Sequence, residues 1–196
     1  AMLLLKIKSL SKGHSGVQLV TVERLLTHLN EGVLPVVPSQ GSLGASGDLA
    51  PLSHLVLPLI GEGELVVDGA VVPSSTVLKA KGWDPIELGA KEGLALINGT
   101  QLMLGYGIMA VQRMDKIAAW ADALCAWSLE AWNGRPEPFD ASIHEVRNHK
   151  GAQESAANIR HWIKDSTWQD LPREQVQDPY SFRCSPQVHG ASRHAL

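Results

Sequence analysis

Residues 41–52 read GSLGASGDLAPL, and they join a glycine-rich loop to an apolar run. Three glycines within seven residues permit a very tight turn, because glycine adopts backbone conformations that other residues avoid. Asp48 then stands where the positive end of a helix dipole favours an acidic side chain, and Pro51 is tolerated in the first helical turn. The stretch therefore predicts a tight loop followed by a helix over residues 48–60.

The centre of this loop is the tripeptide Ala45-Ser46-Gly47. If the amide nitrogen of Gly47 bends back onto the carbonyl carbon of Ala45, a five-membered ring can close with loss of one water. Loss of a second water from Ser46 would leave an exocyclic methylidene group, a strong electrophile made from the backbone alone. Side chains supply nucleophiles, acids and bases but no such electron sink. The alternative interpretation of the tripeptide by itself is a glycine-rich loop that caps a helix.

Outward from this loop the sequence predicts an all-α protein. Residues 100–132 indicate one long helix that is apolar on most of its circumference, and its charge-free run, residues 102–111, is too short for a membrane span. We therefore expect a helix buried at the centre of a bundle of long helices. β-Branched residues around Asp68-Gly69 predict one small β-hairpin. Shorter helices are expected over residues 153–163 and from Ser185 onward, with an irregular stretch over residues 139–151.

Composition indicates an ordinary soluble domain. The 196 residues are 44% hydrophobic and 19% charged, with a net charge of −3, so no basic surface favours a nucleic acid partner. We expect no membrane partner either. Two cysteines, Cys125 and Cys184, make no disulfide framework, which favours a reducing, cytoplasmic setting. We interpret residues 1–196 as a single domain whose two ends read as cuts through helices, that is, as a truncated piece.

Three further motifs have ordinary interpretations when they are taken alone. Asn98 or Thr100 would cap a helix. Tyr180 follows a proline in a turn, and Arg183 would be a solvated charge. His144 and His149 stand five residues apart, which is poor same-face spacing on a helix, so no metal site is expected.

The run GSLGASGDLAPLSH at residues 41–54 resembles the signature of the histidine and aromatic amino-acid ammonia-lyases. The resemblance implies that Ala45, Ser46 and Gly47 mature into the 4-methylideneimidazol-5-one (MIO) group, which needs no metal. Within this signature we assign Gly44 and Asp48 a supporting role in ring formation.

Two other runs resemble further signatures of the same family. The run EGLALINGTQ at residues 92–101 implies that Asn98 sits beside the MIO ring and assists its chemistry. The run VQDPYSFRC at residues 176–184 implies that Tyr180 takes part in proton chemistry and that Arg183 binds the substrate carboxylate, with Gln177 as a polar neighbour. A planar guanidinium suits that task because it can bind both carboxylate oxygens.

The pattern from Phe139 to Gly151 looks most like the histidine-specific branch of the family. It implies elimination of ammonia from L-histidine to give urocanate, in a homotetramer whose active sites draw residues from several subunits. One alternative is a phenylalanine or tyrosine ammonia-lyase, or an aminomutase with the same electrophile. Another is a helical module in which the tripeptide stays uncyclised. We expect little or no turnover from these 196 residues alone.

Overall fold

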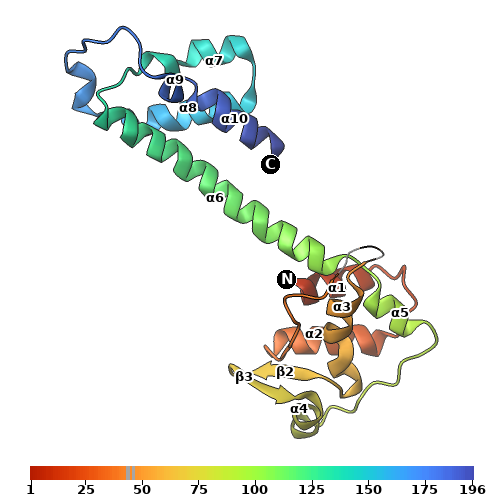
Figure 1. Cartoon of the computed structure of the whole chain (residues 1–196). Coiled ribbons are helices and arrows are strands. Elements are labelled where there is room, and N and C mark those ends of the chain that lie inside the picture. Colours follow the sequence, from red (N-terminus) through yellow and green to blue (C-terminus); the bar gives the residue numbers. More distant parts are fainter. Residues whose placement is uncertain (43–44, 46) are drawn as a thin grey trace. The chain divides into compact units, whose positions relative to one another are not determined.

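The structure is a computed structural model that describes residues 1–42, 45 and 47–196. Helices dominate it, as predicted, and a small sheet accompanies them (Figure 1). The chain divides into two compact units, Ala1–Ile108 and Met109–Leu196. That residues 1–196 form a single domain stays a prediction, and the two units are described separately below.

The first unit carries the loop and most of the shorter helices. Its elements are α1 (Met2–Leu10), α2 (Leu19–Asn30), β1 (Leu34–Pro35), α3 (Leu49–Val56), the 3-10 helix η1 (Leu57–Ile60), β2 (Glu64–Val67), β3 (Ala70–Pro73), α4 (Ser74–Lys81), α5 (Glu92–Ile97) and the start of α6 (Gln101–Ala131). Its main core packs Leu3 of α1, Leu25 of α2, Leu52 of α3 and Leu96 of α5, all at most 5% exposed. The apolar faces of four helices thus meet in one core.

The predicted hairpin is confirmed, and it belongs to a three-stranded antiparallel sheet in the order β1-β2-β3. Asp68 and Gly69 form its turn, both with positive φ (49° and 82°), the conformation that an Asp-Gly hairpin requires. The third strand, β1, was not predicted. It is only two residues long, and it pairs Leu34 with Val66 and Pro35 with Leu65.

The described residues of the second unit form helices and the loops that connect them, with no strand. Its elements are the remainder of α6, the 3-10 helix η2 (Glu137–Phe139), α7 (Ala141–Arg147), α8 (Lys150–Ile163), the 3-10 helix η3 (Thr167–Asp170), α9 (Tyr180–Arg183) and α10 (Ser185–Ala195). Its core packs Leu129 of α6 against Phe139, Ile159 and Trp168. Helices α8 and α10 approach so closely at Gly151 and Gly190 that a Cβ on either glycine would collide with the backbone of the other helix.

One expectation about helices is corrected, and another is confirmed only in part. Residues 139–151 are not irregular, because α7 begins where the Asp140 carboxylate accepts a 2.9 Å hydrogen bond from the amide of Ser142. The long helix α6 is confirmed, but within this chain its apolar side chains are not buried over most of its length. Ile117 is 65% and Trp120 59% exposed, whereas the buried apolar side chains of α6, Ala123, Ala126 and Leu129, all lie toward its C-terminal end.

One helical stretch, Glu92–Ala131, is long and apolar enough to cross a membrane by length and composition alone. Its most apolar window has a mean hydropathy of 1.4, and 11% of that window is buried. A core helix of a soluble protein meets the same two criteria, so this stretch alone is weak evidence for a membrane span.

Candidate active site

The first two signature motifs meet at Gly47 and Gly99. Gly47 has a φ of +124°, and a Cβ built on it would lie 2.8 Å from the carbonyl oxygen of Gly99. The amide of the next residue, Asp48, donates a 2.7 Å hydrogen bond to that same oxygen. The structure therefore brings the Gly47-Asp48 and Asn98-Gly99 peptides together, with no room for a side chain at Gly47. The predictions for Gly44 and Ser46 fall outside the described residues.

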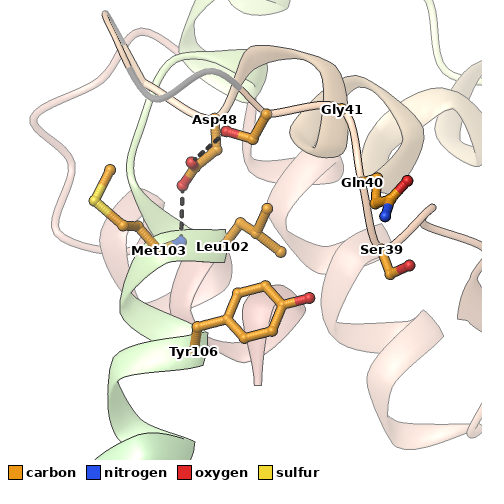
Figure 2. Close-up of a pocket in the computed structure, with 8 residues that line it drawn as sticks. Ser39, Gln40, Gly41, Asp48, Leu102, Met103 and Tyr106 are labelled. Carbon is orange, nitrogen blue, oxygen red and sulfur yellow. Dashed lines mark hydrogen bonds between the residues drawn. The ribbon is translucent and has the colours of Figure 1, made fainter.

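Asp48 is 2% exposed and ties the loop to the start of α6. One carboxylate oxygen accepts a 2.9 Å hydrogen bond from the Ser42 hydroxyl, and the other accepts a 3.0 Å bond from the amide of Met103 (Figure 2). Asp48 also stands at the N-cap of α3, but its side chain makes no capping bond there. The Asp48 carboxylate therefore joins Ser42 of the loop to the start of α6, and its role in ring formation stays a prediction.

An open cleft of about 500 Å³ lies beside Asp48. The residues that line it are Ser39, Gln40, Gly41, Ser42, Asp48, Leu102, Met103 and Tyr106. Figure 2 shows the Tyr106 ring extending from α6 below Leu102. Tyr106 was not predicted as a site residue. The sequence feature that could have identified Tyr106 is its spacing of four residues from Leu102 and three from Met103, which places all three on one face of α6.

Asn98 lies at the C-terminal end of α5, so the interpretation of Asn98 as a helix N-cap is wrong. Its side-chain amide donates a 3.1 Å hydrogen bond to the carbonyl of Leu94, and its own carbonyl oxygen accepts a 3.0 Å bond from the Lys6 ammonium. The side chain is exposed and belongs to the segment that packs on Gly47.

The other end of α5 is anchored by Glu92, which is 1% exposed. Its carboxylate accepts hydrogen bonds from the Thr21 hydroxyl (2.5 Å), the amide of Gly89 (2.7 Å), and both the amide and the side chain of Gln18 (2.8 Å each). Burial alone would raise the pKa of Glu92, but these hydrogen bonds outweigh it and lower the pKa to about 2. Both ends of α5 are therefore fixed.

The third motif lies in the second unit, at and just before α9. Tyr180 is the first residue of α9 and is 70% exposed, and Gln177 is exposed in the preceding segment. The Arg183 guanidinium stacks over the Tyr180 ring at 5.2 Å, and its Nε donates a 2.9 Å hydrogen bond to the Asp178 carbonyl. Within the described chain its two terminal nitrogens form no hydrogen bond, so they can bind an anion.

The profile of the family described as "Aromatic amino acid lyase" matches residues 1–196. The chain belongs to the aromatic amino acid lyase family. The resemblance found in the three motifs is thereby confirmed. A histidine ammonia-lyase of Chloroflexus aurantiacus is 50% identical over 198 residues, and histidine ammonia-lyase 2 of Fusobacterium nucleatum is 49% identical over 197 residues. Both alignments cover 100% of this chain but only 38% and 39% of the relatives, so the chain spans about two fifths of their length.

Solved structures give the same family. A tyrosine aminomutase from Streptomyces globisporus has a TM-score of 0.88 and 40% sequence identity, covering 98% of this chain and 40% of that chain. A histidine ammonia-lyase from Trypanosoma cruzi has a TM-score of 0.84 and 44% identity, covering 98% of this chain and 35% of that chain.

In this member of the aromatic amino acid lyase family, a buried carboxylate holds the segment that leads into α9. Asp178 is 4% exposed and accepts a 2.5 Å hydrogen bond from the amide of Arg135, just beyond the end of α6. The Arg135 guanidinium in turn donates to the carbonyl of Gln175 (2.8 Å). The main chain before Tyr180 is therefore fixed to the end of α6.

A second buried carboxylate, Asp122 of α6, is fully buried and fixes α10, which follows α9 directly. It pairs with the Arg193 guanidinium at 2.6 Å and with His189 at 2.8 Å, and it accepts a 2.9 Å bond from Asn158 of α8. Burial alone would raise the pKa of Asp122, but its hydrogen bonds and the Arg193 charge lower it. No sequence pattern indicated this network, because its members come from three helices.

His144 and His149 each have a structural partner in this lyase-family chain. The ring of His144 is 2% exposed and lies 3.0 Å from the carbonyl of Pro138, and Nδ1 of His149 accepts a 3.2 Å bond from the amide of Ala152. Among the described residues, no group of three or more His, Cys, Asp or Glu side chains is placed to hold a metal ion.

Proposed function

We propose that this chain is the electrophile-bearing part of a histidine ammonia-lyase, which eliminates ammonia from L-histidine to give urocanate. The substrate class is supported by relatives that are 45–50% identical and named histidine ammonia-lyase. The reaction type is supported by family membership. The single observation that carries the proposal is the contact of Gly47 and Asp48 with the Gly99 carbonyl, because it packs the last residue of a cyclisable tripeptide against the peptide bearing Asn98.

The described residues fit an MIO group formed from Ala45-Ser46-Gly47. Ring closure needs the nitrogen of residue 47 to approach the carbonyl of residue 45, and the positive φ of Gly47 and its contact with Gly99 leave room only for glycine. Closure releases one water, and dehydration of Ser46 releases the second. Once formed, the group supplies an electrophile that takes up electron density so that the amino group can leave.

The chain's own side chains bind the substrate and handle protons. The terminal nitrogens of Arg183 would bind both oxygens of the substrate carboxylate. Tyr180, exposed beside that guanidinium, would hold or move a proton at its phenolic oxygen. Gln177 would add a polar contact, and the side-chain amide of Asn98 would assist the chemistry of the electrophile.

We further propose a cytoplasmic homotetramer in which residues from several subunits complete each site. The support is the exposed apolar side of α6, where Met114, Ile117, Leu124 and Trp127 are between 46% and 65% exposed. An exposed apolar surface of this kind marks an association site. Cys125 and Cys184 are both free thiols, as a reducing compartment would leave them.

The intact mass of the purified chain tests cyclisation. We expect the wild-type chain to be two water molecules lighter than its translated sequence. Ser46→Ala should lose at most one, because alanine has no hydroxyl for the second dehydration. A wild-type chain with the translated mass would support the uncyclised module instead.

Product analysis tests the substrate. We would place this chain in the corresponding segment of the Chloroflexus aurantiacus relative, incubate the hybrid with L-histidine and with L-tyrosine, and identify the products. Urocanate from histidine supports the proposal. A β-amino acid from tyrosine would favour an aminomutase, the alternative suggested by the solved tyrosine aminomutase at 40% identity.

A further inference from the structure

Lys6 of α1 is a buried cation whose partners are backbone carbonyls. It is 1% exposed, and no Asp or Glu in the described part of the chain forms a salt bridge with it. Its ammonium donates hydrogen bonds to the carbonyl oxygens of Ala95 (2.8 Å) and Asn98 (3.0 Å). Burial lowers the pKa of Lys6 to about 8.

An ammonium in this place is costly, because burial removes its hydration and backbone carbonyls replace that hydration only in part. The neighbouring residues Leu3, Ile7 and Leu10 of the same helix are buried and apolar, so a hydrophobic side chain would suit the packing. What the ammonium adds is a set of donors for two backbone carbonyls. It therefore fixes the backbone at the C-terminal end of α5.

That backbone is connected to the loop by direct contacts. Asn98, whose carbonyl Lys6 holds, is followed by Gly99, whose carbonyl oxygen accepts the hydrogen bond from the Asp48 amide. The Gly99 backbone is also the surface on which Gly47 packs. A shift of the residue 98–99 peptide would therefore release both Gly47 and Asp48.

We propose that Lys6 is a positioning residue that holds the Asn98-Gly99 backbone against Gly47-Asp48, and that it thereby promotes closure of the Ala45-Ser46-Gly47 ring. The second clause rests on the proposed function, because it presumes that the ring forms. The first clause concerns described backbone contacts only. The two clauses are tested by separate measurements.

The first measurement is amide hydrogen exchange in the 196-residue chain. Lys6→Met nearly keeps the length of the side chain but removes its donors, so we expect the Asp48 amide to exchange about ten times faster or more. The Val36 amide, which bonds to Glu64 in the sheet, should keep its rate. Lys8→Met, an exposed site on the same helix, is the matched control and should change neither amide.

Lys6→Arg restores donors and charge, so it should return the Asp48 amide to within a few-fold of its wild-type rate. An unchanged Asp48 amide in Lys6→Met would overturn the proposal. So would equal acceleration at Asp48 and Val36, because that would show a loss of overall stability rather than of position.

If Lys6→Met does not fold, Lys6→Gln replaces it as the variant in the hydrogen-exchange measurement. Its side-chain nitrogen stands one atom nearer the backbone than that of lysine, so it cannot reach both carbonyls as the ammonium does. We expect the Asp48 amide to exchange faster in Lys6→Gln while the Val36 amide keeps its rate. A wild-type rate at Asp48 in this variant would overturn the proposal in the same way.

The second measurement is the fraction of chains that lose two water molecules, taken on folded protein. We expect this fraction to fall in Lys6→Met and to be retained in Lys8→Met. An equal fraction in Lys6→Met and wild type would overturn the second clause. If the wild-type chain itself keeps its translated mass, the proposed function fails, and the exchange of the Asp48 amide still decides the first clause.

Discussion

The amide of Asp48 donates a 2.7 Å hydrogen bond to the carbonyl of Gly99, which joins two signature motifs that lie far apart in the sequence. The bond requires the backbones to approach so closely that Gly47 has no room for a Cβ. This close packing of the two backbones determines where the Asn98 segment lies and where Asp48 lines the cleft.

Gly47→Ala should prevent ring closure and destabilise the loop. Its Cβ would lie 2.8 Å from the Gly99 oxygen, at a φ of +124° that alanine rarely adopts. Gly82→Ala is the control, since Gly82 has a φ of +65° with nothing within 4 Å of the added Cβ, and it should cost only about 1 kcal/mol. Intact mass and thermal unfolding measure the two effects. Full loss of two water molecules from Gly47→Ala would contradict the packing argument.

Asp48→Asn should loosen the loop without unfolding the first unit. The substitution keeps the side chain's size but replaces one carboxylate oxygen with an amide donor. The amide oxygen, a weaker acceptor than a carboxylate, then has to serve Met103, while the Ser42 hydroxyl has to accept instead of donate. We expect a cost of about 1–2 kcal/mol and faster amide exchange at Met103. Asp68→Asn in the exposed hairpin turn should leave stability unchanged, since Asn also accepts a positive φ. Equal effects of the two substitutions would count against a specific role for Asp48.

Glu92 should make the first unit sensitive to acid. Its pKa falls from an ordinary value of 4.5 to about 2 in the fold, so the unfolded chain binds its proton first as pH decreases. The stability that Glu92 contributes is therefore complete above pH 4.5 and is lost as pH falls toward 2. Glu92→Gln should remove this part of the pH dependence and cost about 2 kcal/mol at neutral pH.

Exchange of the Gln18 amide, which bonds to Glu92, is the measurement for this prediction. Glu87→Gln changes an exposed carboxylate nearby and should leave the acid profile as it is in the wild type. A Glu92→Gln variant that loses stability over the same acid range as the wild type would show that other groups control it.

Asp122→Ala should destabilise the second unit by about 3–5 kcal/mol, because it leaves the Arg193 charge without its buried partner. Glu154→Ala removes the other carboxylate bonded to Arg193, but Glu154 is 58% exposed, so we expect at most about 1 kcal/mol. Tryptophan fluorescence during urea unfolding reports on this unit, since five of the six tryptophans lie in it. Similar costs for the two substitutions would contradict the difference in burial.

The sequence by itself determined the helical class, the hairpin at Asp68-Gly69 and the bounds of the long helix, because turn chemistry and hydrophobic periodicity are local. It also determined the family, since the three motifs carry the resemblance. It led to a wrong expectation for residues 139–151, where the Asp140 cap was not recognised. It also predicted burial along α6, which depends on neighbours that no single segment encodes and stays a prediction for most of the helix.

Only the tertiary structure decided which groups meet. The Gly47–Gly99 contact, the donors around Glu92, the Asp122 network and the Lys6 ammonium on the end of α5 all join residues far apart in the chain. Periodicity shows which face of a helix is apolar, but it does not show that one buried position holds a lysine whose partners are backbone carbonyls. A backbone carbonyl is the same in every residue, so no sequence pattern marks it as a partner. Only folding brings the Lys6 ammonium and these carbonyls together.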